Sequence, residues 1–287
     1  MTELQDKTNN AINRIQFAYE TAQAMGNGLV LAYSGGKDSD VMLNLTIKSG
    51  APFRVEHNHT TVDAPETVHH IREVFEGLEA QGVTSKVNKP KTSMWELIVE
   101  KGIPPLRHVR YCCEYLKERK FDNQHLLIGV RWAESHRRKG RGVHEAMHKD
   151  ISKRKLMFDD NEETRRALEI CTGKNRIATN PIIDWTDSEV WEYAKRENIK
   201  MNPLYNCDFR RVGCIGCPMA SKAVHKEFAR YPKYKNAYIR AFDKMILKLD
   251  EKSVQRNEVW KDGNGVFRWW TERNYDPNQM ELWEDMT

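Results

Sequence analysis

The stretch LVLAYSGGKDS, residues 29–39, passes from an apolar run through a glycine-rich turn toward a helical pattern. Val30 and Leu31 suit a buried strand, and apolar residues recur at helical spacing over residues 40–47. Two consecutive glycines let the backbone approach an anion closely, and the unpaired amides at the start of a helix point toward it. The stretch therefore predicts a phosphate-binding turn between a strand and a helix.

The composition limits the class of protein. A chain of 287 residues can bury one substantial core, or one core with a smaller appended element. It contains no run approaching the roughly 18 apolar residues that span a bilayer, and residues 1–7 lack the apolar segment of a signal peptide. We therefore expect a cytoplasmic protein with no membrane partner. The net charge of +5 suits an anionic nucleotide or a longer nucleic acid and does not distinguish them.

Strand patterns alternate with helical ones along the first two thirds of the chain. Strands are expected near residues 53–58, 83–87 and 125–130, with helices before residue 26 and from Pro65 to about residue 80. A further helix is expected from about Asp187 to Glu197, which Thr186 or Asp187 could cap. This order predicts an α/β fold with a doubly wound, mostly parallel sheet and helices on both faces. We expect a nucleotide-binding domain at residues 1–230 and a helical, tryptophan-rich extension at residues 231–287.

A basic segment follows the last of these strands. Residues 131–155 contain nine lysines or arginines and three acidic residues, with few large apolar side chains. The pattern predicts a mobile surface loop, which is either a solvated face or a lid that orders around an anionic substrate.

Four of the six cysteines form two close pairs. Cys112 and Cys113 are adjacent, and Cys214 and Cys217 form a C-x-x-C loop. Thiolates in this arrangement suit a soft metal, and reduced intracellular cysteines more often serve metal or redox chemistry than disulfides. Neighbouring side chains diverge, so the adjacent pair fits an iron-sulfur cluster better than a single zinc ion.

The SGGKDS turn resembles the PP-loop of the N-type ATP pyrophosphatases, also called adenine nucleotide alpha hydrolases. The resemblance implies that residues 34–39 grip the pyrophosphate of ATP, or the phosphate or sulfate of an adenylyl-sulfate. By the same resemblance, Lys37 neutralises phosphate charge and Asp38 orients the loop or a magnesium ion. The implied nucleotide-binding residues of the loop are Ser34, Gly35, Gly36, Lys37, Asp38 and Ser39.

Residues 110–117, RYCCEYLK, resemble the R-x-C-C-x-x-L-K signature of the PAPS/APS reductase family. Further matches are the stretches at residues 60–67, 129–135, 180–185 and 202–205, so that the likeness extends over about residues 28–225. In cluster-bearing members of this family the two cysteine pairs hold a 4Fe-4S cluster. The implied cluster ligands are Cys112, Cys113, Cys214 and Cys217.

The resemblance also implies two further nucleotide contacts. Arg131 would face the anionic end of the nucleotide, and Asp63, with the loop at residues 57–61, would lie beside it. Asp63 also fits a simpler structural explanation, because Asp-Ala-Pro-Glu is typical of a helix start. We take Lys37, Asp38 and Asp63 as the candidate catalytic residues.

The chain departs from the assimilatory reductases of this family at one point. Those enzymes carry a catalytic cysteine in an E-C-G-x-H segment near the C-terminus, whereas no cysteine follows Cys217 here. The first hypothesis is therefore ATP-dependent sulfur transfer with a 4Fe-4S cluster and Mg²⁺. Its partners would be a sulfur donor such as a cysteine desulfurase and an acceptor that the sequence leaves open, with nucleic acid, as in DNA phosphorothioation, as one candidate.

Two other hypotheses remain open. The chain could reduce PAPS or APS with Cys171, Cys207 or the thiol of a thioredoxin-like partner in place of the missing cysteine. It could also be a non-catalytic subunit that senses a nucleotide and holds a structural cluster.

Overall fold

The computed structural model of the chain describes residues 2–118, 125–147, 155–157, 176–220, 223–255 and 257–272. Contacts divide the chain into two compact units, neither of which is continuous in sequence. The first unit comprises residues 1–58, 65–88 and 120–212, and the second comprises residues 59–64, 89–119 and 213–287. The nucleotide-binding domain expected at residues 1–230 and the extension expected at residues 231–287 stay a prediction, because a division by contacts does not test them.

A seven-stranded sheet forms the centre of the first unit, in the order β3-β2-β1-β4-β7-β5-β6 among the described residues. The strands are β1 (Leu29–Ala32), β2 (Arg54–Asn58), β3 (Ser85–Asn88), β4 (His125–Leu127), β5 (His144–Met147), β6 (Lys155–Met157) and β7 (Arg176–Thr179). From β3 to β7 each neighbouring pair is parallel. The predicted α/β class with a mostly parallel sheet is therefore confirmed.

The last two strands correct the interpretation of the basic segment. β5 pairs antiparallel with both β7 and β6, so part of residues 131–155 is sheet and not surface loop. The strand was missed because it buries polar residues. Glu145 is 1% exposed, and its carboxylate accepts hydrogen bonds from the Gly142 amide and the Arg141 guanidinium. A polar pattern in sequence therefore concealed a buried strand.

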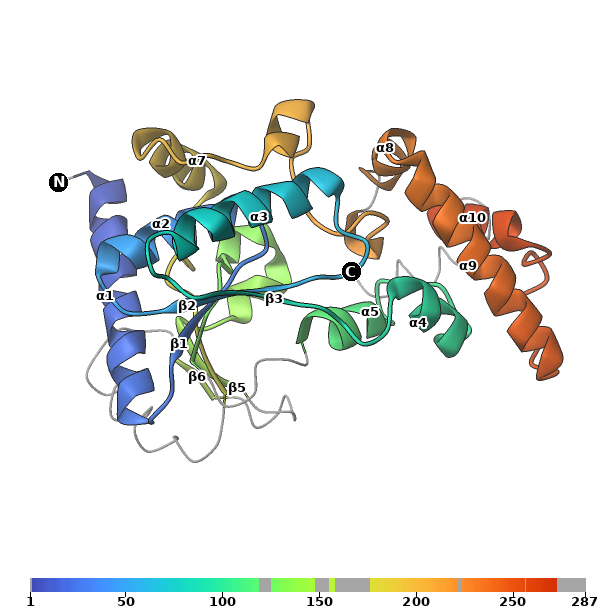
Figure 1. Cartoon of the computed structure of the whole chain (residues 1–287), viewed down its shortest axis with the longest axis horizontal. Coiled ribbons are helices and arrows are strands. Elements are labelled where there is room, and N and C mark those ends of the chain that lie inside the picture. The colour runs from blue at the N-terminus through green and yellow to red at the C-terminus, as the bar shows by residue number, and fades with distance from the viewer. Residues whose placement is uncertain are drawn as a thin grey trace. The chain divides into compact units, whose positions relative to one another are not determined.

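Successive residues of β1 face two different cores. Leu29 and Leu31 belong to the large core cluster, whereas Val30 packs with Leu126 and Ala178. This alternation is expected of a strand that is buried on both faces. Most other side chains of the large cluster come from α1 (Glu3–Ala24), α2 (Lys37–Ser49), α3 (Pro65–Glu79) and α7 (Asp187–Arg196). Figure 1 shows α1 beside the strands.

Local capping signals set the helix ends in the first unit. Thr186 caps α7, because its hydroxyl accepts the Glu189 amide and the Glu189 carboxylate accepts the Thr186 amide. Pro65 occupies the first position of α3, where its missing amide hydrogen costs nothing. The helices expected from Pro65 and from Asp187 are therefore confirmed.

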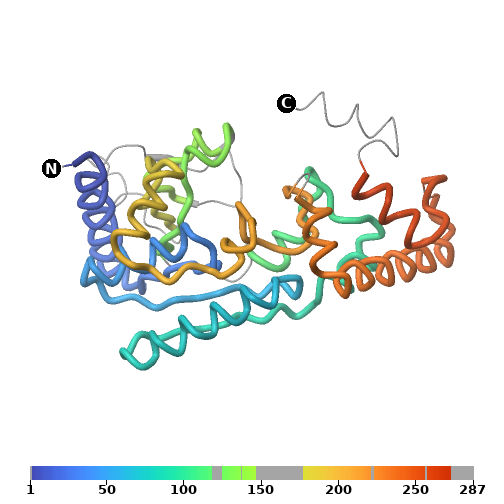
Figure 2. The backbone as a smooth tube through the Cα atoms, turned by 90° about the horizontal axis from the view of Figure 1, so that it is seen from above, coloured from blue at the N-terminus to red at the C-terminus, as the bar shows by residue number. Residues whose placement is uncertain are grey.

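The second unit is mainly helical. Its helices are α4 (Met94–Lys101), α5 (Tyr111–Cys113), α8 (Ala223–Arg230), α9 (Pro232–Glu251) and α10 (Gly263–Thr271). Figure 2 shows α9 and α10 side by side. Trp270 lies at the centre of their aromatic contacts, with ring centroids of Tyr238 and Phe242 at 4.9 and 5.5 Å. The predicted C-terminal helices are thus confirmed.

Short helical turns complete the described structure. They are Glu114–Glu118 (η1, a π-helical turn), Trp132–Glu134 (η2), His136–Gly140 (η3), Pro203–Cys207 (η5) and Pro218–Ala220 (η6). Within the described ranges, none of the helices is long and apolar enough to cross a bilayer.

Two buried histidines share one hydroxyl group in the sheet. His125 Nε2 and His144 Nδ1 lie 2.7 and 2.9 Å from Thr179 Oγ1, and each histidine is 1% exposed. The hydroxyl can donate its one hydrogen to only one ring, so the other ring donates to the hydroxyl oxygen. Burial, with a smaller contribution from His144, lowers the pKa of His125 to about 3. His125 is therefore neutral in the folded protein at neutral pH.

Acidification should destabilise the protein through His125. An unfolded imidazole has a pKa of about 6.5, so below that pH the unfolded state takes up a proton that the folded state excludes down to about pH 3. The free energy of unfolding should fall by up to about 1.4 kcal/mol per pH unit from this residue. Urea unfolding between about pH 7 and 4.5 should show a shallower decline for His125→Gln, which keeps a neutral polar side chain. Equal slopes would contradict this assignment.

Candidate phosphate loop and cysteine site

The turn after β1 has a backbone shape that only glycine adopts easily. Gly35 has a φ of +71°, and a Cβ atom there would lie 2.9 Å from Ile71 Cγ1 and 3.1 Å from Thr67 Cγ2. The side chain of Asn202 also contacts this turn, because its Nδ2 donates to Gly35 O at 2.8 Å and to Thr67 Oγ1 at 3.1 Å. The loop is therefore held between α3 and the segment before η5.

Hydroxyl groups join this loop to the first turn of α2. Ser39 Oγ donates to Gly36 O at 2.8 Å and accepts the Gly36 amide at 3.1 Å. Ser34 Oγ donates to Ser39 Oγ at 3.2 Å. Both serines thus stabilise the loop itself, and their donation to a ligand phosphate stays a prediction.

A buried cluster supports α2 one turn further on. Asp40 Oδ1 accepts a hydrogen bond from the Tyr33 hydroxyl and lies 3.0 Å from His70 Nε2. Tyr33 lies just after β1 and His70 lies on α3. The cluster therefore ties the start of α2 to both neighbouring elements.

Two cations and two carboxylates meet at the start of α2. Arg131 Nε donates to Asp38 Oδ1 at 2.7 Å, and Arg131 Nη2 donates to Asp187 Oδ1 at 3.0 Å. Lys37 Nζ lies 3.0 Å from the same Asp187 oxygen and 3.3 Å from Asp38 Oδ2. The structure thus brings together the predicted Lys37, Asp38 and Arg131, although Arg131 lies 93 residues after Asp38 in the sequence.

Sequence reasoning missed two residues of this site. Asp187 was expected only to cap α7, but in the structure it also pairs with Lys37 and Arg131. Burial alone would raise the pKa of Asp187, but hydrogen bonds from these two cations outweigh it and hold that pKa below its usual value. Tyr205 lies in one of the stretches that match the family, residues 202–205, but sequence reasoning assigned this tyrosine no role. Its hydroxyl accepts the Lys37 amide at 2.9 Å, and burial holds its pKa well above the usual value. Neither contact had a signal in sequence, because both partners come from distant segments.

The second unit brings the two cysteine pairs together. Cys112 and Cys113 lie on α5, and Cys214 and Cys217 lie in the loop before η6. The charges of the other three thiols all act on Cys112. Sulfur ligands of a single zinc ion would lie about 3.8 Å apart. Among the described residues, however, no three cysteine sulfurs lie within 4.8 Å of one another. The role of the four thiols as metal ligands stays a prediction.

Polar groups around these thiols act on them unequally. Hydrogen bonding to Cys113, together with burial, raises the pKa of Cys112, and burial raises the pKa of Cys214. Cys113 Sγ accepts a hydrogen bond from Arg110 Nη2 at 3.1 Å. A hydrogen bond from Cys112, outweighing burial and reinforced by Arg110, lowers the pKa of Cys113 to about 5. The Cys214 thiolate and the neighbouring thiols raise the pKa of Lys117. The site therefore contains the positive charge that metal-bound thiolates require.

The loop that carries the second pair is fixed by backbone hydrogen bonds. Gly216 has a φ of +71°, and its amide donates to Glu227 Oε2 at 2.8 Å. Ile215 O accepts the Tyr238 hydroxyl at 2.9 Å, and the Ile215 amide donates to Val62 O at 2.8 Å. Helices α8 and α9 therefore hold the C-x-x-C loop in place.

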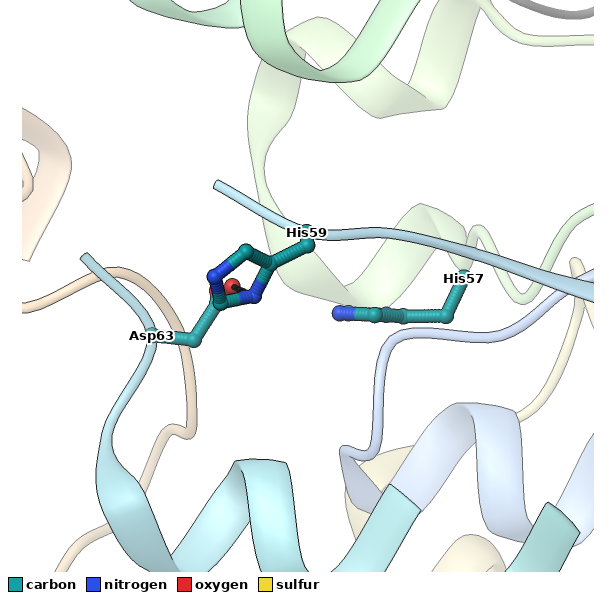
Figure 3. Close-up of side chains that lie close together, drawn as sticks. All are labelled: His57, His59 and Asp63. Atoms are coloured by element: carbon teal, nitrogen blue, oxygen red, sulfur yellow. Dashed lines mark ion pairs between the residues drawn. The ribbon is translucent and has the colours of Figure 1, made fainter. Parts of the chain in front are cut away.

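Asp63 lies in the second unit, with the cysteines. Its carboxylate accepts the amide and the hydroxyl of Thr60, both at 2.7 Å, and its Oδ2 lies 3.1 Å from His59 Nδ1. Figure 3 shows the His59 and Asp63 side chains turned toward one another. A backbone bridge joins Asp63 to Cys214, and Thr60 Oγ1 lies 3.4 Å from Cys214 Sγ. The carboxylate thus closes a turn beside the cysteine loop, and its catalytic role stays a prediction.

The structure describes only one of the two remaining cysteines. Cys207 is partly buried at the end of η5, in the first unit. Cys171 lies outside the described residues. The role of either as a sulfur carrier stays a prediction.

Comparison with known proteins identifies the family. Residues 28–220 match the model of the phosphoadenosine phosphosulfate reductase domain. The chain belongs to this family. The resemblance to this family noted in the sequence is therefore confirmed.

Curated relatives are similar at moderate identity. This chain is 28% identical over 269 residues to the uncharacterized protein MJ0066 of Methanocaldococcus jannaschii. The match covers 90% of this chain and 49% of that protein. The chain is 25% identical over 212 residues to the adenosine 5'-phosphosulfate reductase of Oceanobacillus iheyensis, covering 74% and 79%. The chain spans about half the length of the archaeal relatives it matches.

Solved structures show a more distant similarity. The phosphoadenylyl-sulfate reductase of Candida auris, in a phosphate complex, covers 75% of this chain and 96% of its own, with a TM-score of 0.47 and 16% identity. The U34-tRNA thiolase NcsA of Methanococcus maripaludis, with its [4Fe-4S] cluster, covers 86% and 80%, with a TM-score of 0.42 and 15% identity.

Replacing Gly35 with alanine should distort the phosphate loop. The left-handed conformation and the close approach to Ile71 should together lower the free energy of unfolding by about 2 to 3 kcal/mol. Gly77→Ala is the matched control, because Gly77 lies within α3 with open space around it. That change should raise stability by about 0.5 to 1 kcal/mol. Denaturant unfolding measures both, and a neutral Gly35→Ala would refute the strained turn.

Proposed function

We propose that this chain is an adenylating sulfur-transfer enzyme, which binds ATP at residues 34–39 and holds a 4Fe-4S cluster with Cys112, Cys113, Cys214 and Cys217. The observation that carries the proposal is the group of cations at the start of α2. Lys37 is 8% and Arg131 1% exposed, and such buried cations require anionic partners. The Lys37 amide at the helix start adds a donor to the same place.

In the proposed reaction an oxygen of the acceptor attacks the α-phosphorus of ATP. The bond from that phosphorus to the oxygen bridging the β-phosphorus breaks, and pyrophosphate leaves. A sulfur nucleophile then attacks the adenylated carbon or phosphorus of the acceptor, and AMP leaves with the acceptor oxygen. The acceptor thereby exchanges oxygen for sulfur.

The residues around the loop would act by position and charge. Lys37 and Arg131 would neutralise the charge that develops on the departing pyrophosphate, as preorganised donors do at transferring phosphoryl groups. Asp38 holds Arg131 at 2.7 Å, and its carboxylate is a suitable oxygen ligand for a Mg²⁺ ion bound with the nucleotide.

The four thiols fit an iron-sulfur cluster by donor chemistry. When bound, such a cluster would supply a site for sulfur or electron transfer. Arg110 and Lys117 would offset the negative charge of its thiolate ligands. The immediate sulfur source would be a donor protein such as a cysteine desulfurase.

The proposed acceptor is nucleic acid. The segment at residues 131–155 contains nine lysines or arginines and three acidic residues. Such a group of like charges suits a ligand with repeated phosphates.

Sulfonucleotide reduction is the second candidate. The similarity over 74% of this chain to a relative named adenosine 5'-phosphosulfate reductase favours it. That reaction needs a further nucleophilic thiol, for which Cys207 or a thioredoxin-like partner would serve. Sulfite release from APS or PAPS, measured beside pyrophosphate release from ATP, decides between the two reactions.

The Lys37→Ala variant should abolish nucleotide turnover under either reaction. Loss of one charge-stabilising group of this kind typically costs about 100-fold or more in rate. Lys48→Ala is the control, because Lys48 lies at the far end of α2 and pairs with Glu197 at the surface. Pyrophosphate release from ATP, with an unfolding curve for each variant, measures the effect. Full activity in Lys37→Ala would rule out the loop as the nucleotide site.

Anaerobically prepared protein should contain about four irons per chain and absorb broadly at roughly 400 nm. Cys214→Ser should lose most of the iron and the colour, because one of four ligands is removed. Cys207→Ser, which changes a cysteine of the first unit, should keep both. Metal analysis that finds one zinc ion per chain and no colour would contradict the cluster.

A further inference from the structure

We propose that Asp187 and Tyr205 are internal occupants of the phosphate loop, which a phosphate-bearing ligand must displace. Asp187 would thereby lower the affinity of the loop for such ligands. The inference rests on the proposed function in one respect, namely that a nucleotide phosphate binds at residues 34–39.

Each of these side chains places an oxygen atom on a group that would otherwise bind phosphate. Asp187 Oδ1 lies 3.0 Å from both Lys37 Nζ and Arg131 Nη2. Tyr205 Oη lies 2.9 Å from the Lys37 amide nitrogen. One carboxylate oxygen and one phenol oxygen thus occupy both cations and an amide at the helix start.

The carboxylate is the partner that can move. The Asp187 side chain is 66% exposed, whereas the side chains of Lys37 and Arg131 are 10% and 2% exposed. Turning Asp187 into water therefore requires no change in the core. Removing either cation from its place would instead break the packing around it.

Asp187 and Tyr205 are also connected through α7. Asp187 is the first residue of that helix, and Trp191 lies one turn further along. The Trp191 ring contacts the Tyr205 ring edge-on, with centroids 5.1 Å apart. A displacement of Tyr205 would therefore act on the helix that carries Asp187.

A ligand with several charged oxygens can displace these occupants. Without a ligand, Asp187 compensates two buried cations that would otherwise be costly. A pyrophosphate group can replace the carboxylate at both cations and the phenol at the amide, because it offers several anionic oxygens. A ligand without phosphate offers no such compensation and cannot compete. The internal occupants therefore lower the affinity of the loop for phosphate-bearing ligands, whereas a nucleoside leaves them in place and binds with the same affinity whether or not they are present.

Asp187→Asn tests the inference by binding measurements. Calorimetry would use inorganic pyrophosphate, ATP and adenosine as probes. The ligand-free variant lacks the two ion pairs that the exposed Asp187 carboxylate makes with Lys37 and Arg131, so pyrophosphate and ATP should bind roughly three- to tenfold more tightly to it. Adenosine binding should not change. Glu192→Gln, which removes one charge from an exposed position of the same helix, should leave all three affinities unchanged.

Tyr205→Phe tests the second occupant. It keeps the ring against Trp191 and removes only the hydroxyl, so pyrophosphate should again bind more tightly, by roughly two- to fivefold for one hydrogen bond. Unchanged or weaker pyrophosphate binding in Asp187→Asn would overturn the role of Asp187, and the same result in Tyr205→Phe would overturn that of Tyr205. A weaker affinity would assign the side chain to the ligand's own contacts.

Lys37→Ala separates this inference from the proposed function. If pyrophosphate binds equally well to Lys37→Ala and to the unmodified chain, the loop is not the nucleotide site and the proposed function fails. If binding needs Lys37 and Asp187→Asn gives no gain, only the inference of internal occupants fails. An unfolding curve for Asp187→Asn shows that any change in affinity belongs to a folded protein.

Discussion

The left-handed turn at Gly35 is the constraint on which the phosphate loop depends. Gly35 has a φ of +71°, and a Cβ atom there would lie 2.9 Å from Ile71 and 3.1 Å from Thr67. In this conformation the chain turns sharply out of β1 and starts α2 at Lys37. That turn directs the Lys37 amide and side chain toward the segments that carry Arg131, Asp187 and Tyr205. Because a side chain at residue 35 would meet α3, the position of α3 and the shape of the loop are determined together.

Charge compensation is the second constraint. Arg131 is buried almost completely, and a buried guanidinium is stable only when its hydrogens are matched by acceptors. Asp38, Asp187 and the Trp185 carbonyl supply them from two segments of the chain. The same compensation makes the loop stable without a ligand, so that binding becomes an exchange of one anion for another. An exposed carboxylate is suited to this exchange because its departure leaves the core intact.

Local signals explain how much the sequence could predict. The strand-glycine-helix transition at residues 29–39 and the capping of α7 at Thr186 depend on neighbouring residues, so both were predicted. Strand β5 was missed because the buried Glu145 looks like a surface residue until its hydrogen bonds are known. Tyr205 was missed because it meets the Lys37 amide across 168 residues. Sequence patterns report periodicity and rare residue types, whereas these contacts depend on tertiary structure.

The cysteine site depends on residues beyond the family match. The match ends at residue 220, yet Glu227 and Tyr238 hydrogen-bond the C-x-x-C loop at Gly216 and Ile215. A Cβ atom at residue 216 would lie 2.8 Å from Phe228 and 2.9 Å from Tyr238, so α8 and α9 leave the loop only one conformation. Four cysteines therefore indicate the kind of site, but the C-terminal helices determine how the second pair is presented. A family resemblance limited to the cysteines omits the part of the chain that holds them in place.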